Sequence, residues 1–292
     1  MKKVLFATTA LIATAGVASA DITLSGSAAM GLRYTEDGAA NNNANDTVFD
    51  SEIDFTISAS GESDNGIAFG ASMDFGNSET DQVESHDTAN DGEVYINYQG
   101  VKVTFGDVGG QTKDAIANPG YQGTGADDLA EAGDIGDYDV NASFSTAGLA
   151  FGVSYGSDTE DFAISVTGSA GDVSWGIASI NDNDGSDVVE LTAGYSSGAY
   201  SLNGLYADVS GATAAADLKA YGLSVAYAMD ATTYTFAMSD TNADNQDANY
   251  GVGFSTNLGG GLSFAGGVSV DGATTAGGEG ITKADLGFNM AF

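Results

Sequence analysis

Residues 281–292, at the end of the chain, read ITKADLGFNMAF and decide the fold. Every second residue is apolar or small, and the chain closes on an aromatic side chain. This parity comprises Thr282, Ala284, Leu286, Phe288, Met290 and Phe292, and the other parity comprises Lys283, Asp285, Gly287, Asn289 and Ala291. Because side chains of a β-strand alternate between its two faces, the pattern predicts a strand with one apolar face and one wet face.

The same alternation recurs about sixteen times after residue 20, in segments of about 8–12 residues, the length that a tilted membrane strand needs. Opposite the apolar faces stand mainly Gly, Ser, Ala, Thr, Asn and Asp, which suit a water-filled interior. No later run reaches eighteen apolar residues, so we exclude helical spans, and only a closed barrel satisfies the backbone in lipid. The sequence therefore predicts an all-β fold, a 16-stranded antiparallel transmembrane β-barrel.

The first twenty residues form a separate unit. Lys2 and Lys3 precede an apolar run over Val4–Val17, which is too short to span a bilayer. Ala18, Ser19 and Ala20 fit the small-x-small cleavage rule of secretory signals. We expect residues 1–20 to be a cleaved signal peptide and 21–292 to form a single barrel domain.

The charge balance limits the possible partners. The chain has 41 acidic and 7 basic residues, a formal net charge of −34 and no Cys. Such a chain has no cationic surface for nucleic acid and no thiols for disulfides or metal. A solvated, salt-adapted surface accounts equally well for many of the carboxylates. Outside the first three residues the only bases are Arg33, Lys102, Lys113, Lys219 and Lys283.

The connections between the predicted strands alternate between long and short, as in barrels with long external loops and short periplasmic turns. The longest covers about 109–137, is acidic and contains the single Pro, Pro119. Tyrosines near the strand ends suit the interface belt, although the strand propensity of Tyr also explains them: Tyr34, Tyr98, Tyr155, Tyr195, Tyr206 and Tyr227. Lys219 does not fit the pattern of an apolar outer face, because its parity places this charged side chain on the face toward lipid.

Three stretches resemble the sixteen-stranded general porins of Gram-negative bacteria, particularly those of α-proteobacteria such as Rhodobacter. Residues 21–34 resemble the first strand, 102–107 the strand before the third loop, and 287–292 the terminal strand. The resemblance implies an outer-membrane homotrimer that passes small hydrophilic solutes by passive diffusion. It also implies that 109–137 is an inward-folded third loop that constricts the pore, and that the barrel-assembly machinery recognises Phe292. The alternative to an inward-folded loop is that 109–137 is a flexible loop on the surface.

The site residues follow from this resemblance and from parity. We assign the constriction loop the residues Lys113, Asp114, Asp127, Asp128, Glu131, Asp134 and Asp137. We assign the pore wall Arg33, Glu52, Asp54, Asp74, Glu93, Lys102, Lys283 and Asp285. The family places a basic cluster opposite the acidic loop, and this chain departs from that pattern because few bases face inward. A carboxylate-lined pore predicts a channel that prefers cations.

The acidic loop and the single His raise the questions of metal binding and catalysis. Asp127, Asp128, Glu131 and Asp134 offer oxygen ligands for a structural Ca²⁺ ion, and diffuse counterions are an equally good reading. His86 is the single His and has no implied catalytic partner, so we expect no enzyme activity and no other cofactor. The alternative to a porin is a secreted, acidic surface β-protein without a pore, which would not explain sixteen apolar faces.

Overall fold

The structure is a computed structural model that describes residues 21–36, 46–80, 83–87, 92–130, 138–183, 185–211, 217–244, 246–273 and 278–292. The expected signal peptide, residues 1–20, lies outside the described residues. So do three of the predicted loop carboxylates, Glu131, Asp134 and Asp137. Among the residues that the structure describes, no helix is long and apolar enough to cross a membrane.

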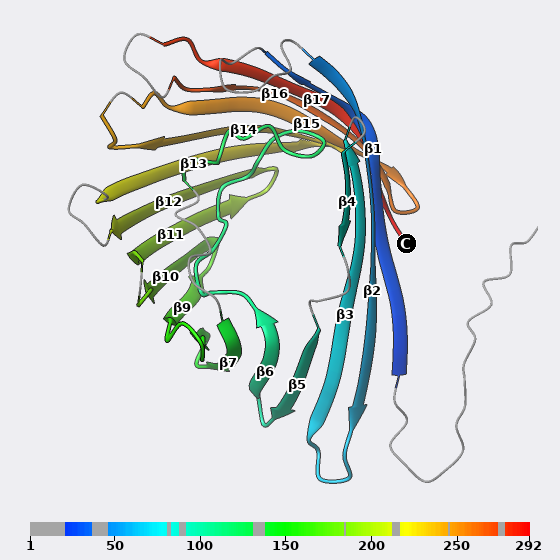
Figure 1. The fold of residues 1–292 in the computed structure, drawn as a ribbon, viewed down its shortest axis with the longest axis vertical. Helices are drawn as coiled ribbons and strands as arrows, with labels where there is room; N and C mark the ends of the chain where they lie inside the picture. The colour runs from blue at the N-terminus through cyan, green and yellow to red at the C-terminus, as the bar shows by residue number, and fades with distance from the viewer. Residues whose placement is uncertain are drawn as a thin grey trace, which may run out of the picture.

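In the residues that the structure describes, seventeen β-segments form one antiparallel sheet, in which neighbours along the chain pair, except that β4 and β5 both pair with β3 (Figure 1). The segments are β1 Asp21–Thr35, β2 Asp46–Glu62, β3 Ala68–Thr80, β4 Val83–Asp87, β5 Glu93–Tyr98, β6 Val101–Val108, β7 Tyr138–Thr146, β8 Leu149–Tyr155, β9 Phe162–Ala170, β10 Val173–Asn181, β11 Asp187–Ser197, β12 Tyr200–Ser210, β13 Leu218–Met229, β14 Thr232–Thr241, β15 Asn249–Gly259, β16 Leu262–Asp271 and β17 Ile281–Ala291.

The sheet closes between its first and last strands. β1 pairs with β2 on one side and with β17 on the other. Phe292 completes this seam, because its N–H and C=O exchange hydrogen bonds with Gly26 at 3.0 and 2.9 Å. Its ring lies 6.0 Å from that of Phe55 on β2. Closure leaves no open sheet edge, which in lipid would cost several kcal/mol for each unsatisfied backbone group.

The predicted strand number is confirmed once β4 and β5 are taken together. β5 pairs with the Ala68–Ser72 end of β3, and β4 pairs with the other end, from Gly76 to Thr80. The two segments therefore form one interrupted strand, and seventeen segments make sixteen strands.

The expected segment length is wrong at the start of the barrel. We predicted segments of about 8–12 residues, whereas β1 has 15 and β2 has 17. β3 likewise continues to Thr80, and β4 follows at Val83–Asp87. Hairpin hydrogen bonds continue beyond the membrane, where both faces meet water and the apolar alternation that marked the strands disappears.

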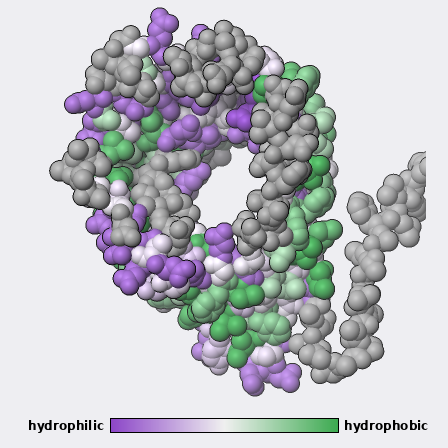
Figure 2. All heavy atoms as spheres, in the orientation of Figure 1, coloured by the Kyte–Doolittle hydropathy of each residue, from purple (hydrophilic) through white to green (hydrophobic). Residues whose placement is uncertain are grey.

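The apolar parity faces outward and is exposed, as membrane-facing side chains should be. Examples are Ile53 at 47%, Ile177 at 49% and Val252 at 56% exposure. Figure 2 shows a central opening inside the ring of atoms, with hydrophobic residues along the outer flank on the side of β1 to β3. Lys219 shares the outward parity, as predicted, and its Nζ lies 3.9 Å from Asp208 on the neighbouring strand.

The buried apolar cluster does not fill the barrel. It lies between the inner wall and the segment that follows β6, with further members near the ends of the neighbouring strands. Its members are Val108, Ile116, Ala126, Ala130, Tyr138, Ala163, Ile180, Val188, Leu205, Ala207, Val209, Ala220 and Ala237.

Candidate functional site

The candidate site is formed by residues 109–130, here called the inner segment, and the wall beside it. Figure 1 shows this segment leaving β6 and crossing the inside of the ring toward β13 to β17. Near its start, the side-chain amide of Gln111 donates to Ser154 Oγ at 2.8 Å and accepts from Ser165 Oγ at 2.7 Å. Both Ser residues belong to the inward parity of β8 and β9. The segment is therefore tied to the wall from its start.

The middle of the inner segment is held through its backbone. The N–H of Lys113 donates to Glu190 Oε1 on β11 at 2.7 Å, and the N–H of Ala117 donates to Ser224 Oγ on β13 at 3.2 Å. Glu190 and Ser224 are both buried by this contact. An irregular segment cannot satisfy its own backbone N–H groups. The oxygens of these wall side chains therefore accept the hydrogen bonds that a neighbouring strand would accept in a sheet.

The tip of the segment is held most tightly. The two carboxylate oxygens of Asp285 on β17 accept the backbone N–H groups of Tyr121 at 2.8 Å and Gln122 at 2.9 Å. The Gln122 side chain reaches Glu52 Oε2 on β2 at 2.8 Å, and Asn289 donates to the Tyr121 carbonyl at 3.1 Å. These contacts come from β17 and β2, the two strands that flank β1.

A compact turn shapes this tip from within. Asn118 Oδ1 accepts the N–H groups of Thr124 at 2.8 Å and Gly125 at 3.0 Å. The Thr124 hydroxyl donates back to the Pro119 carbonyl at 2.8 Å. Gly120, at a φ of 135°, packs so closely on the Asp285 carboxylate that an added Cβ would lie 2.6 Å from its oxygens. Only Gly fits this close approach.

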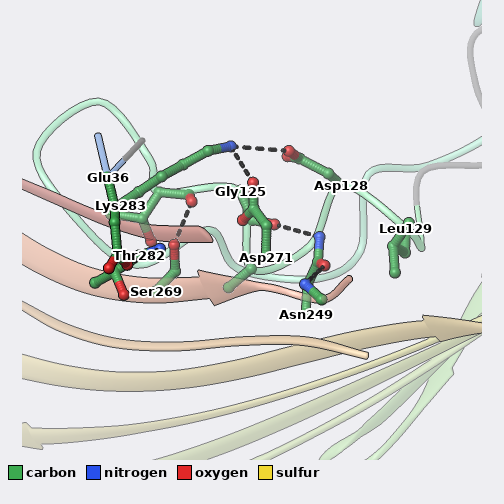
Figure 3. Close-up of polar contacts among 12 residues, drawn as sticks. Glu36, Gly125, Asp128, Leu129, Asn249, Ser269, Asp271, Thr282 and Lys283 are labelled. Atoms are coloured by element: carbon green, nitrogen blue, oxygen red, sulfur yellow. Dashed lines mark hydrogen bonds and ion pairs between the residues drawn. The ribbon is translucent and has the colours of Figure 1, made fainter. Parts of the chain in front are cut away.

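The returning half of the segment is bound by hydroxyl and amide side chains of β14 to β16. Ser269 Oγ donates to the Thr124 carbonyl at 2.5 Å, and Asn249 Nδ2 donates to the Gly125 carbonyl at 3.0 Å (Figure 3). Ser239 Oγ donates to the Ala126 carbonyl and accepts from the Leu129 N–H, at 2.8 and 3.2 Å. These polar wall residues are buried by the segment.

Inward glycines give the segment room to lie against the wall. An added Cβ at Gly222 would lie 2.5 Å from Ile116, and one at Gly251 would lie 2.9 Å from Ala126. At Gly253 it would meet the Gly120 nitrogen at 2.9 Å. A run of small residues on β13 to β17 thus forms a seat for the inner segment.

Lys283 lies where the segment returns along the wall. Its ammonium forms an ion pair with Asp271 on β16, and Asp128 of the inner segment lies 3.9 Å away (Figure 3). The Asp128 side chain is 52% exposed, against 20% for Asp271. The predicted loop residue Asp128 and the predicted wall residue Lys283 therefore meet at one point, and an exposed carboxylate remains on the open side.

The other predicted wall residues lie on the inward parity of β1, β2, β3, β5 and β6. Lys102 on β6 places its Nζ 4.6 Å from the centre of the Tyr95 ring, and Asp54 on β2 accepts from Ser27 Oγ at 3.4 Å. Asp74 and Glu93 lie on β3 and β5. Glu52 accepts a hydrogen bond from Gln122 at the segment tip, as described above. Arg33 on β1 is exposed and is the cross-strand partner of Asp285.

The predicted charged residues of the loop differ in exposure. Lys113, Asp114 and Asp128 are exposed, whereas Asp127 is only 1% exposed. In the part of the chain that the structure describes, no three Asp, Glu, His or Cys side chains are placed to hold a metal ion. Because Glu131 and Asp134 lie outside that part, calcium binding at these carboxylates stays a prediction.

Sequence reasoning missed the residues that anchor the inner segment, above all Tyr121, Gln122 and Asn249. Tyr121 is 4% exposed. Burial, with the Asp50 carboxylate nearby, raises the pKa of its phenol to about 12. A signal was present in the inward Gly residues of the last strands, because Gly within a strand often marks a place where another backbone approaches closely.

A closed antiparallel barrel of sixteen strands, with an apolar outer face and a polar inner wall, defines an outer-membrane β-barrel channel. The family model described as Gram-negative porin matches residues 7–276, and the chain belongs to this family. It is an outer-membrane porin that crosses the membrane many times as a β-barrel, and it is a channel rather than an enzyme.

Two porins are similar to the chain along most of their length. The porin of Fuscovulum blasticum is 26% identical over 304 residues, covering 93% of this chain and all of the relative. The porin of Rhodobacter capsulatus is 28% identical over 299 residues, covering 85% and 94%. Structures of two variants of the Rh. blastica porin match with TM-scores of 0.75 and 0.74, at 24% and 23% identity, over 93% of this chain and 100% of theirs. They bear out the fold.

Proposed function

We propose that the inner segment narrows this porin, and that the narrowed pore passes small hydrophilic solutes by diffusion with a preference for cations. The observation that carries the proposal is the seat of residues 109–130. Hydrogen bonds from β8, β9, β11 and β13 to β17 keep this segment inside the barrel rather than above it. A segment held in this way reduces the open cross-section for every solute.

The charges along the opening support the cation preference. Exposed or half-exposed inward carboxylates include Asp54, Asp74, Glu93, Asp114 and Asp128, and the corresponding bases are Arg33, Lys102, Lys113 and Lys283. Lys283 is paired with Asp271, so its charge is largely compensated. Lys102 lies against an aromatic ring on the wall. Rings of carboxylates favour cations and repel anions.

The test of selectivity is the zero-current potential of the purified porin in a planar bilayer across a KCl gradient. We expect a potential of the sign that K⁺ permeation produces. A potential of the opposite sign would overturn the cation preference. The control is the double variant Asp74→Asn/Asp128→Asn, which should move the potential toward zero if these carboxylates carry the effect.

The narrowing role has a separate test. Removing the two tip anchors in the variant Asp285→Ala/Gln122→Ala should increase single-channel conductance and admit larger neutral sugars in liposome-swelling assays. The control is Ser27→Ala, which removes an inward hydrogen bond between β1 and β2 away from the segment and leaves the charge of Asp54 in place. Unchanged conductance and unchanged sugar permeation would show that the segment does not set the pore size.

We further propose a homotrimer that packs through part of the outward apolar face against neighbouring subunits and outer-membrane lipid. Closed symmetry suits such a self-complementary surface. We also propose that the barrel-assembly machinery recognises the terminal strand ending at Phe292, whose ring is 64% exposed. Analytical ultracentrifugation in detergent tests the trimer, and assembly of Phe292→Ala in cells tests the second proposal.

A further inference from the structure

The tip of the inner segment lies across the seam where the barrel closes. Gly31 on β1 and Gly287 on β17 are cross-strand partners in this seam. The Tyr121 ring packs over both of them: an added Cβ would lie 2.8 Å from the ring at Gly31 and 2.5 Å at Gly287. With its side chain 4% exposed, Tyr121 covers the joint between the first and the last strand from inside.

The polar contacts of the tip lie on both sides of the same seam. Asp285 and Asn289 on β17 bind the backbone of Tyr121, and Gln122 binds Glu52 on β2, beyond β1. These wall residues come from the two ends of the barrel sequence and become neighbours only when β1 pairs with β17. Neither end alone offers the tip a complete seat.

We infer that Tyr121 is a positioning residue that fastens the inner segment to the closed seam, so that barrel closure and the seating of the segment stabilise each other. This inference deepens the proposed narrowing role. An unclosed barrel would lack the Gly31–Gly287 surface and one set of hydrogen-bond partners, and the segment tip would have no place to dock. Conversely, a docked tip adds buried contacts to both strands of the seam and opposes their separation. Coupling of this kind is reciprocal by linkage.

Amide hydrogen exchange of the intact porin in detergent, followed by mass spectrometry, distinguishes opening of the β1–β17 seam from loosening of the inner segment elsewhere. Local opening of a strand pair appears as faster exchange of its backbone amides. In Tyr121→Ala we expect roughly tenfold faster exchange in peptides covering Ala28–Arg33 and Ala284–Asn289, the scale of one or two lost buried contacts. Exchange in β13 should stay at the wild-type rate.

The matched control is Ile116→Ala. Ile116 is equally buried, at 4% exposure, and anchors the same segment, but it packs on Gly222 of β13, away from the seam. This variant should loosen the segment and leave exchange in the seam unchanged. Tyr121→Phe keeps the ring and should restore the slow exchange of the wild type, which distinguishes ring packing from a general loss of folding.

The outcomes are distinct for the two proposals. Seam exchange that is unchanged in Tyr121→Ala, or that rises equally in Ile116→Ala, overturns the inference. Single-channel conductance of the same variants reports on the narrowing role: if the seam exchanges faster in Tyr121→Ala while conductance stays at the wild-type value in both variants, the seam fastening stands and the narrowing role fails.

Discussion

Asp285 accepts the backbone N–H of Tyr121 at 2.8 Å, and this hydrogen bond joins the last strand of the barrel to a segment 164 residues earlier in the chain. The second oxygen of the same carboxylate accepts the next N–H, that of Gln122, at 2.9 Å. A carboxylate is suited to this position because each of its two oxygens accepts a hydrogen bond. Asp285 is 7% exposed, so water does not replace either bond.

Asp285→Asn should therefore weaken the seat. The amide keeps one acceptor oxygen and turns an NH₂ group toward the other backbone N–H, which is left without a partner. A buried donor left unsatisfied costs about 1–3 kcal/mol. We expect a loss of that size in the free energy of unfolding, measured by urea titration of the folded porin in lipid vesicles, together with noisier single-channel currents.

Asp74→Asn is the control for this substitution, because Asp74 is an inward but exposed carboxylate on β3. It removes the same charge without touching the segment. If both variants lose equal stability, the effect comes from charge alone and the role of Asp285 as an anchor is refuted.

Gly222→Val tests the seat from the wall side. An added Cβ at Gly222 would stand 2.5 Å from Ile116 and 2.6 Å from Ala130, so the inner segment must move toward the lumen. Overpacking of this kind costs about 1–3 kcal/mol. We expect a lower single-channel conductance because the displaced segment fills more of the opening. Gly204→Val on the adjacent strand is the control, since the nearest atom to its added Cβ is 3.8 Å away.

The sequence predicted the barrel because each strand carries its own signal. Alternation such as that of Leu286, Phe288 and Met290 is local, and it needs no knowledge of the neighbouring strand. The position of the predicted third loop followed from its length. The interruption between β4 and β5 had no such signal, because above the membrane both faces of a strand meet water.

The anchors of the inner segment could not be predicted in the same way. Ser224, Ser239 and Ser269 look like ordinary inward residues, and their partners lie more than 100 positions away in the chain. Asp285 was predicted to line the pore wall; in the structure its inward carboxylate is covered by the segment that it binds. Parity determines the face of a side chain, but it does not reveal what covers that face.

The pH dependence of the seat follows from Tyr121, whose phenol has a pKa raised to about 12 by burial and by the nearby Asp50 carboxylate. An unfolded chain releases this proton near pH 10. The stability that Tyr121 contributes is therefore complete below pH 10 and is lost as the pH rises from about 10 toward about 12. The difference in absorbance at 295 nm between wild type and Tyr121→Phe should titrate with a midpoint near 12. A midpoint near 10 would place the ring in water and contradict the burial of Tyr121 against the barrel wall.

Lys283 and Lys219 form a natural pair for testing which charges reach the pore. Lys283 faces inward beside Asp271 and Asp128, whereas Lys219 faces outward beside Asp208. Lys283→Met leaves two carboxylates uncompensated at the inner segment, so the preference for cations should increase. The zero-current potential across a KCl gradient should move further in the K⁺ direction, and Lys219→Met should leave it unchanged because its charge lies outside the lumen. Equal shifts in the two variants would mean that net protein charge, rather than the charge lining the opening, determines selectivity.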